Sequence, residues 1–234
     1  MPMSASPRNR FERRRAETRQ ALVRAARQLL ADSGDTSASI RTIAELADVG
    51  FGSFYNHFTS KPDLFDAAVA DALEEFARAV DKHLHGVDDP AERLAAGMRL
   101  SARMASSHPE IMRILCHSEL GRISAGCGLA PRARHDVEQG MTSGRFTVVD
   151  PMIALTVLNG SLLALLQLWF HQPEADRDHA AAKMAETLLH MLGVSVEEAR
   201  DLARRPLPVA GKTMCRLHSW MGRWRGPRSM AFCR

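Results

Sequence analysis

The segment between Ser39 and Lys61 gathers side chains that can bind a nucleic acid. Guanidinium, hydroxyl, amide, imidazole and ammonium groups occur there within a short stretch, and all of them can donate hydrogen bonds to phosphates or base edges. Two short helices are predicted around them, Ile40–Ala47 and about Phe51–Asn56, joined by a tight turn. Asp48 suits that turn because aspartate tolerates a positive φ better than most residues. This arrangement is typical of a helix-turn-helix, whose second helix enters the major groove of DNA.

The apolar spacing in this segment separates a small core from an outward face. Five residues can close the core between the two helices, namely Ile43, Ala44, Val49, Phe54 and Phe58. The polar and aromatic residues between them are then free to point outward: Arg41, Thr42, Phe51, Ser53, Tyr55, Asn56 and His57. A short helical hairpin inside an ordinary helical domain explains the same pattern, so both interpretations stay open at this point.

The elements that must hold this segment are helical throughout. Apolar residues at three- and four-residue spacing predict a helix from about Phe11 to Asp32, and Ser60, Pro62 and Asp63 announce another that extends to about Leu84. The same patterns continue along the chain at Ala91–Ser106, Pro109–Leu120, Pro131–Met141, Pro151–Phe170, Asp176–Leu192 and Ser195–Arg204. No alternating stretch is long enough for a sheet, so we expect an all-α fold.

Charge is distributed unevenly along the 234 residues. The net charge of +4 combines +6 over residues 1–27 and +8 over residues 204–234 with −10 between them. An acidic body with a basic leading segment suits a protein that offers one end to a polyanion. A basic arm at the start of the chain could follow phosphates or enter a minor groove, and a disordered charged end explains it equally well. The arm consists of Arg8, Arg10, Arg13, Arg14 and Arg15.

Several other classes of protein find little support. The longest apolar stretch, Met152–Phe170, is interrupted by polar residues and is interpreted as a buried helix, so we expect no membrane partner. The basic N-terminus lacks the apolar stretch of a secretion signal, and the four cysteines have no short paired spacing, which favours reduced thiols in the cytoplasm. Cys116, His117, Cys127 and His135 have no recognised ligand spacing, so neither a metal nor a cofactor is expected. Without a nucleophile elbow or phosphate loop, an enzyme is not expected.

The segment around the predicted helix-turn-helix resembles the TetR/AcrR family of bacterial transcription regulators. The likeness covers Leu22 to about Val69 and rests on Ile43-Ala44, Ala47, Val49, Gly52, Tyr55, His57-Phe58, Ser60-Lys61 and Leu64. A weaker likeness covers Gly144–Phe146 and Asp150. Two positions depart from the family pattern: Asp48 stands where glycine is usual, and Gly50-Phe51 stands where serine and a polar residue are usual.

The resemblance implies specific roles for these residues. Arg41 would contact a phosphate or a base edge, and Phe51 and Ser53 would face the groove, where Phe51 could contact a thymine methyl. Tyr55, His57 and Lys61 would hold phosphates, the last one aided by the helix end behind it. The outward-facing Thr42 and Asn56 complete the expected DNA-binding set.

The resemblance also implies a second domain that binds a small molecule and dimerises. Dimerisation would use the last two long helices, Pro151–Phe170 and Asp176–Leu192, and the partner would be a second copy of the chain. Candidates for the lining of the effector pocket are Met98, Met104, Met112, Leu115, His117 and Trp169. Ordinary core packing explains most of these residues as well.

These expectations divide the chain into four parts. Residues 1–9 form a disordered arm, 10–60 the helix-turn-helix domain, 61–205 the helical effector-binding and dimerisation domain, and 206–234 a basic, poorly ordered tail. The expected function is a dimeric repressor that binds double-stranded operator DNA and is released by a small, largely apolar effector. The alternative is a DNA-organising protein without an effector, which would lack a real pocket.

Overall fold

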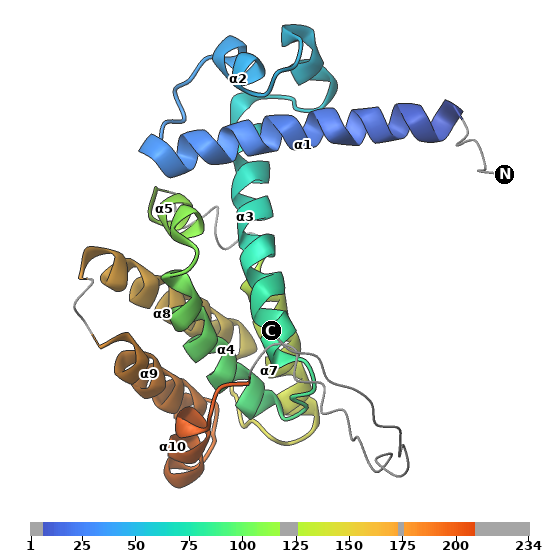
Figure 1. The fold of residues 1–234 in the computed structure, drawn as a ribbon. Coiled ribbons are helices and arrows are strands. Elements are labelled where there is room, and N and C mark those ends of the chain that lie inside the picture. Colours follow the sequence, from blue (N-terminus) through green and yellow to red (C-terminus); the bar gives the residue numbers. More distant parts are fainter. Residues whose placement is uncertain (1–6, 118–125, 173–175, 209–234) are drawn as a thin grey trace, which may run out of the picture.

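The chain folds into helices that form two parts joined by one long helix (Figure 1). The computed structural model describes residues 7–117, 126–172 and 176–208. Within these ranges the elements are α1 (Pro7–Ser33), α2 (Ile40–Leu46), the 3-10 helix η1 (Phe51–Asn56), α3 (Lys61–Leu84), α4 (Pro90–Ala105), α5 (Pro109–His117), α7 (Leu129–Thr142), α8 (Pro151–His171), α9 (Arg177–Met191) and α10 (Val196–Arg204). No strand occurs in the described ranges, and the expected all-α fold is confirmed.

Local capping explains why the helix-turn-helix elements begin where they do. The Ser39 hydroxyl accepts a hydrogen bond from the backbone of Thr42 at the start of α2, and the Ser60 hydroxyl does the same for Asp63 at the start of α3. Asp48 adopts the expected left-handed conformation with φ of 53°. Gly50 is the N-cap of η1 with an extended backbone, so it does not weaken the interior of the recognition helix.

Helix α1 begins at Pro7, earlier than the residue near Phe11 that the periodicity predicts. Proline is favourable in the first turn of a helix, and none of the next residues interrupts it, so the helix continues into the segment expected to be disordered. Residues 1–6 lie outside the described residues, as do residues 209–234 of the expected tail. Leu207, just before them, packs against the core.

The N-terminal part consists of α1, α2, η1 and the first turns of α3. Its core contains the five residues that the apolar spacing predicts: Ile43, Ala44, Phe54 and Phe58 are buried, and Val49 packs against the core. From this part α3 runs into the second part, where α4 lies against α9 and α10, and α7 and α8 pack beside it (Figure 1). One continuous helix therefore belongs to both domains.

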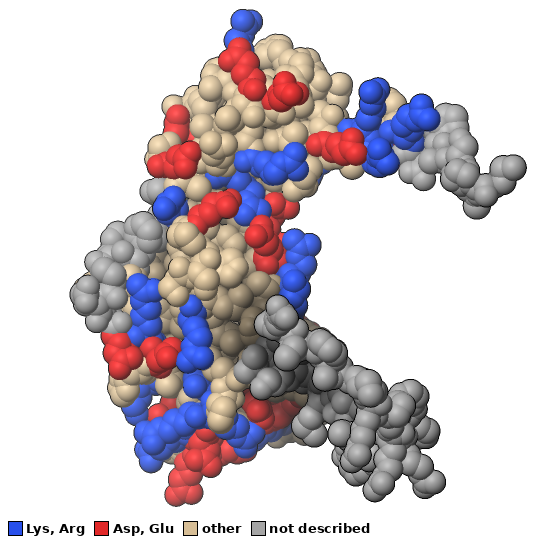
Figure 2. All heavy atoms as spheres, viewed as in Figure 1, with Lys and Arg blue, Asp and Glu red and all other residues tan. Residues whose placement is uncertain are grey.

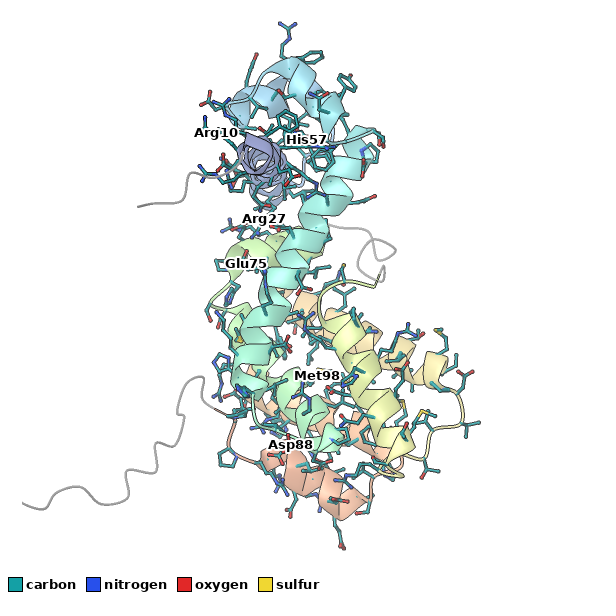
Figure 3. All side chains as sticks on the ribbon, turned by 90° about the vertical axis from the view of Figure 1, so that its right-hand side faces the viewer. Arg10, Arg27, His57, Glu75, Asp88 and Met98 are labelled. Carbon is teal, nitrogen blue, oxygen red and sulfur yellow. The ribbon has the colours of Figure 1, made fainter. Side chains whose placement is uncertain are left out.

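Arg27 ties the two parts together at their junction. Its guanidinium, which is almost fully buried on α1, donates to Asp71 at 2.9 Å and Glu75 at 2.7 Å on α3, and to Glu110 at 3.0 Å on α5. Figure 3 shows Arg27 and Glu75 close to each other at this level. Burial lowers the pKa of Arg27, but the hydrogen bonds that Arg27 donates to Glu75 and Asp71 more than offset this effect and leave the pKa raised. The guanidinium is therefore a charged link between both domains.

Candidate functional site

The helix-turn-helix presents most of the expected DNA-binding residues to solvent. Phe51 is 49% exposed and Tyr55 59% exposed, and their rings meet edge to face at 6.0 Å. Arg41, Thr42 and Asn56 are also exposed, while Ser53 and His57 are partly buried. These seven residues thus have solvent-accessible side chains on α2, on η1 or directly after it.

Lys61 is engaged in a way that the sequence did not suggest. Its ammonium lies 3.0 Å from the carbonyl oxygen of Ser37, 3.1 Å from that of Ala38 and 3.5 Å from that of Thr36. Lys61 therefore holds the loop between α1 and α2 against the start of α3. If the Lys61 ammonium also contacts a phosphate, it must do so while it binds these carbonyl oxygens.

The environment of His57 is electropositive. Burial lowers the pKa of His57 first, and the charges of Arg15 and Arg19 on α1 lower it further. The Arg19 guanidinium also lies over the ring of Phe58, 5.1 Å from its centroid. The arginines of α1 are therefore close to the end of η1, although they precede it by some forty residues of sequence.

Two neighbouring cavities lie in the helical bundle. The larger, of about 540 Å³, is lined by residues of α3, α5, α7 and α8 and of the stretch before α7. The smaller, of about 60 Å³, lies between α3, α4, α7 and α8. Both are lined in part by Leu129, Asn159 and Leu162, so they adjoin each other. The larger volume is within the range of small-molecule sites.

The smaller cavity combines apolar walls with buried polar groups. Asp136 on α7 is almost fully buried and accepts a hydrogen bond of 2.9 Å from Arg93 on α4, which also donates to the carbonyl oxygens of Leu84 and Val87. Burial raises the pKa of Asp136 in spite of this ion pair. Arg132, another lining residue, donates to Glu74 and Asp81 on α3. These charged groups were not among the residues expected for the pocket.

The expected lining residues are distributed over several environments. Met98 lines the smaller cavity and Leu115 the larger one. Met104, Met112 and Trp169 pack in or against the core and line neither of these two cavities, as the ordinary packing of such residues predicts. The side chain of His117 lies outside the described residues.

Helix α8 carries an apolar face that the described chain leaves open. It contains the one described segment that is long and apolar enough to cross a membrane, Pro151–Trp169, and it packs against α4, α5, α7 and α9. One side of α8 is exposed and consists of apolar and small residues at three- and four-residue spacing: Ile153, Val157, Gly160, Ala164 and Leu168. Of these, Gly160 also borders the larger cavity. We call these five residues the α8 stripe.

Among the described residues there is a free thiol but no cluster of metal-binding side chains. These residues contain no group of three or more histidine, cysteine, aspartate or glutamate side chains arranged to hold an ion. Cys127 is a free thiol whose pKa is raised by burial, and the side chain of Cys116 lies outside the described residues.

Comparisons with known proteins match both parts of the chain. Residues 22–68 match the family described as bacterial regulatory proteins, tetR family, and residues 89–205 match the family described as tetracyclin repressor-like, C-terminal domain. The two matched ranges contain the helix-turn-helix and the whole bundle from the N-cap of α4 to the end of α10.

Individual relatives extend this result. The solved structure of RolR in complex with resorcinol is 34% identical, with a TM-score of 0.60, and the match covers 86% of this chain and 100% of RolR. The nicotine-responsive transcriptional repressor HdnoR of Paenarthrobacter nicotinovorans is 30% identical over 45% of this chain. The transcriptional repressor KstR2 of Mycolicibacterium smegmatis is 28% identical over 47% of it. The chain spans about half the length of these two curated relatives, 53% of each.

Proposed function

Because this chain belongs to the TetR family of bacterial regulatory proteins, we propose that it is a dimeric transcriptional repressor that leaves its operator when a small hydroxylated aromatic compound binds. The observation that carries this proposal is the pairing of a solvent-exposed recognition surface with a partly polar cavity, joined by α3. The cavities favour this function over a DNA-organising protein without an effector.

The DNA-binding part rests on the exposed surface of α2 and η1. Arg41 stands near the start of α2, where it can reach a phosphate or a guanine edge, and Phe51 offers an apolar surface to a thymine methyl. Tyr55, Asn56 and His57 supply hydroxyl, amide and imidazole groups for the backbone. Lys61 would act mainly as a positioning residue, since it fixes the loop that precedes α2.

Dimerisation through the α8 stripe is supported by its composition and exposure. Ile153 is 59% exposed and Val157 37% exposed. Gly160, one turn after Val157, has no side chain, and no atom from outside α8 lies close to it, so a second helix could approach α8 closely there. Contiguous apolar surface of this kind usually marks a protein interface. A second copy related by a two-fold axis would place the same face of its own α8 against the α8 stripe. We expect such a regulator to act in the cytoplasm.

The effector class follows from the cavity and from the relative with a bound ligand. RolR was solved with resorcinol, a benzene ring with two hydroxyl groups. In the smaller cavity Asp136 and Arg93 can bond hydroxyl groups, while Leu94, Met98 and Leu158 can surround a ring. An engineered cavity that holds benzene measures about 150 Å³, so the ring would also use part of the adjoining larger cavity.

The signal would travel through α3. The lining residues Val80, Asp81 and Leu84 belong to α3, whose first residue, Lys61, holds the loop before α2. A ligand that binds one position of α3 more tightly than the other shifts the equilibrium between them by that difference in affinity. The Arg27 link would transmit this shift from α3 and α5 to α1.

One experiment tests both halves of the proposal. The full chain should enrich specific duplexes from a random DNA pool, and resorcinol should release it from them. Asp136→Asn should bind the same duplex but need at least about tenfold more resorcinol, because one charge-assisted hydrogen bond contributes about 1.5–3 kcal/mol. The exposed Asp88→Asn is the matched control and should respond as the wild type does.

The outcomes separate the two halves. Failure to enrich any duplex would refute DNA binding. Retention of the duplex at every resorcinol concentration would refute the effector class, and an unchanged response of Asp136→Asn would refute its site.

A further inference from the structure

The first half of α1 projects from the molecule without packing against it. Residues 10–17 are all exposed, including Phe11 at 71%, and the first buried side chain of α1 is Leu22. At 1.5 Å per residue the stretch from Pro7 to Glu17 extends about 16 Å. Figure 1 shows this end of α1 standing clear of α3, on the side opposite to α8 and α9.

This projecting half is strongly basic. Residues 10–19 contain five arginines and two glutamates, and Arg13 and Glu17 form an exposed ion pair at 3.2 Å. Within the described residues no ion pair involves Arg10, Arg14 or Arg15. Arg10 and Arg14 stand four residues apart, as do Arg15 and Arg19, and like charges at this spacing destabilise an isolated helix. A short exposed helix is marginal in water, so a polyanion alongside would stabilise it by neutralising these charges.

The basic stretch is continuous with the DNA-binding surface. Arg19 contacts Phe58, and Arg15 and Arg19 are close enough to His57 to act on its charge, so the arginines extend the electropositive surface beyond the end of η1. Figure 2 shows lysine and arginine atoms gathered on the projecting end, and Figure 3 places Arg10 at the same end of the molecule as His57. Acidic side chains are sparse there, with Glu12 and Glu17 as its two acids.

We propose that residues 10–19 of α1 form a second DNA contact, which binds the phosphates of the duplex that flanks each half-site on its outer side. We call these residues the α1 arm. The inference rests on the proposed binding of DNA by η1 and adds a contact that is independent of base sequence. Because the arm points away from α8, which carries the proposed dimer interface, each protomer would carry it outward from the two-fold axis. At 1.5 Å per residue its ten residues span about 15 Å, which corresponds to about four base pairs at 3.4 Å each.

The test compares salt dependence and flank dependence. Arg10→Gln/Arg14→Gln/Arg15→Gln is made in the full chain, and its affinity is measured for a duplex selected by the wild type, first alone and then extended by about ten base pairs (roughly one turn) at each end. Each lost phosphate contact lowers the slope of log K against log salt by about 0.9, so the dimer should lose about five. The wild type should bind the extended duplex at least tenfold more tightly than the short one, and the variant should not distinguish them.

The control is Arg24→Gln/Arg78→Gln/Arg113→Gln, which removes the same charge from exposed positions outside the arm. It should keep the wild-type slope and flank dependence. An arm variant with the wild-type slope, or a control that loses as much as the arm variant, would overturn the proposal. If the wild type selects no duplex at all, the proposed function itself is wrong, and this result differs from both.

Discussion

Replacement of Arg93 by methionine is expected to lower the free energy of unfolding by about 3 kcal/mol at neutral pH. Methionine preserves much of the length of the side chain but leaves the Asp136 carboxylate buried without its partner, and the Asp136 side chain is only 6% exposed. The same change also removes the hydrogen bonds from Arg93 to the carbonyl oxygens of Leu84 and Val87 at the end of α3. Urea unfolding of the wild type and the variant measures the difference.

The loss should depend on pH in a defined direction. Burial raises the pKa of Asp136 in the folded protein, so the folded state favours the protonated acid and is penalised as the pH rises above the unfolded value. Without Arg93 this penalty grows. The destabilisation should therefore shrink as the pH falls from 7 towards about 4, near the usual pKa of aspartate.

An exposed ion pair provides the control for this prediction. Arg103 pairs with Asp178 at the surface, where their side chains are 56% and 66% exposed. Arg103→Met should change the stability by less than about 1 kcal/mol at either pH. Equal losses for Arg93→Met at pH 7 and pH 4 would contradict the account of a buried carboxylate that needs its partner.

Val157→Arg is expected to convert the dimer into monomers and to lower the affinity for operator DNA by at least about 100-fold. The substitution places a charge in the middle of the α8 stripe, where a second copy would leave it buried and unpaired. Two monomers bind the two half-sites of the operator independently, so the gain in affinity from simultaneous binding by a dimer disappears. Sedimentation gives the oligomeric state, and titration of a selected duplex gives the affinity.

Gln139→Arg introduces the same charge at an exposed position of α7 and should leave both quantities unchanged. A Val157→Arg protein that stays dimeric and folded would show that the α8 stripe is not the interface.

Local signals in the sequence predicted the elements well. Ser60 caps α3 as predicted, and Ser39 and Asp150 cap α2 and α8, because a cap depends on residues two or three places away. The two departures from the family pattern are also local. Asp48 takes a conformation that it tolerates, and Gly50 lies outside the recognition helix as its cap.

The interior of the bundle could not be predicted in the same way. The ion pair of Arg93 and Asp136 joins residues 43 positions apart, and nothing near either residue indicates the other. The spacing of methionine and leucine indicates which residues face the interior of the bundle. Of the residues predicted to line the pocket, Met98 and Leu115 line the cavities. Which residues line a cavity depends on how four helices pack together, and that information is spread over the whole chain.

Lys61 illustrates a different limit. Its place at the start of α3 suggested a phosphate contact, yet three carbonyl oxygens of the loop before α2 surround its ammonium. Loop carbonyls leave no signal in side-chain spacing, so a structural role of this kind becomes visible only when the backbone is known.

If the surface of α2 and η1 binds operator DNA, the Arg41→Ala/Tyr55→Ala protein should bind a selected duplex much more weakly than the wild type. Both side chains are exposed, so their loss should leave the fold and the dimer intact. The affinity should fall at least about 100-fold, because hydrogen bonds to charged groups contribute about 1.5–3 kcal/mol each. Glu45→Ala, also exposed on α2, should bind at least as tightly as the wild type. A folded, dimeric Arg41→Ala/Tyr55→Ala protein with wild-type affinity would show that this surface does not bind the operator.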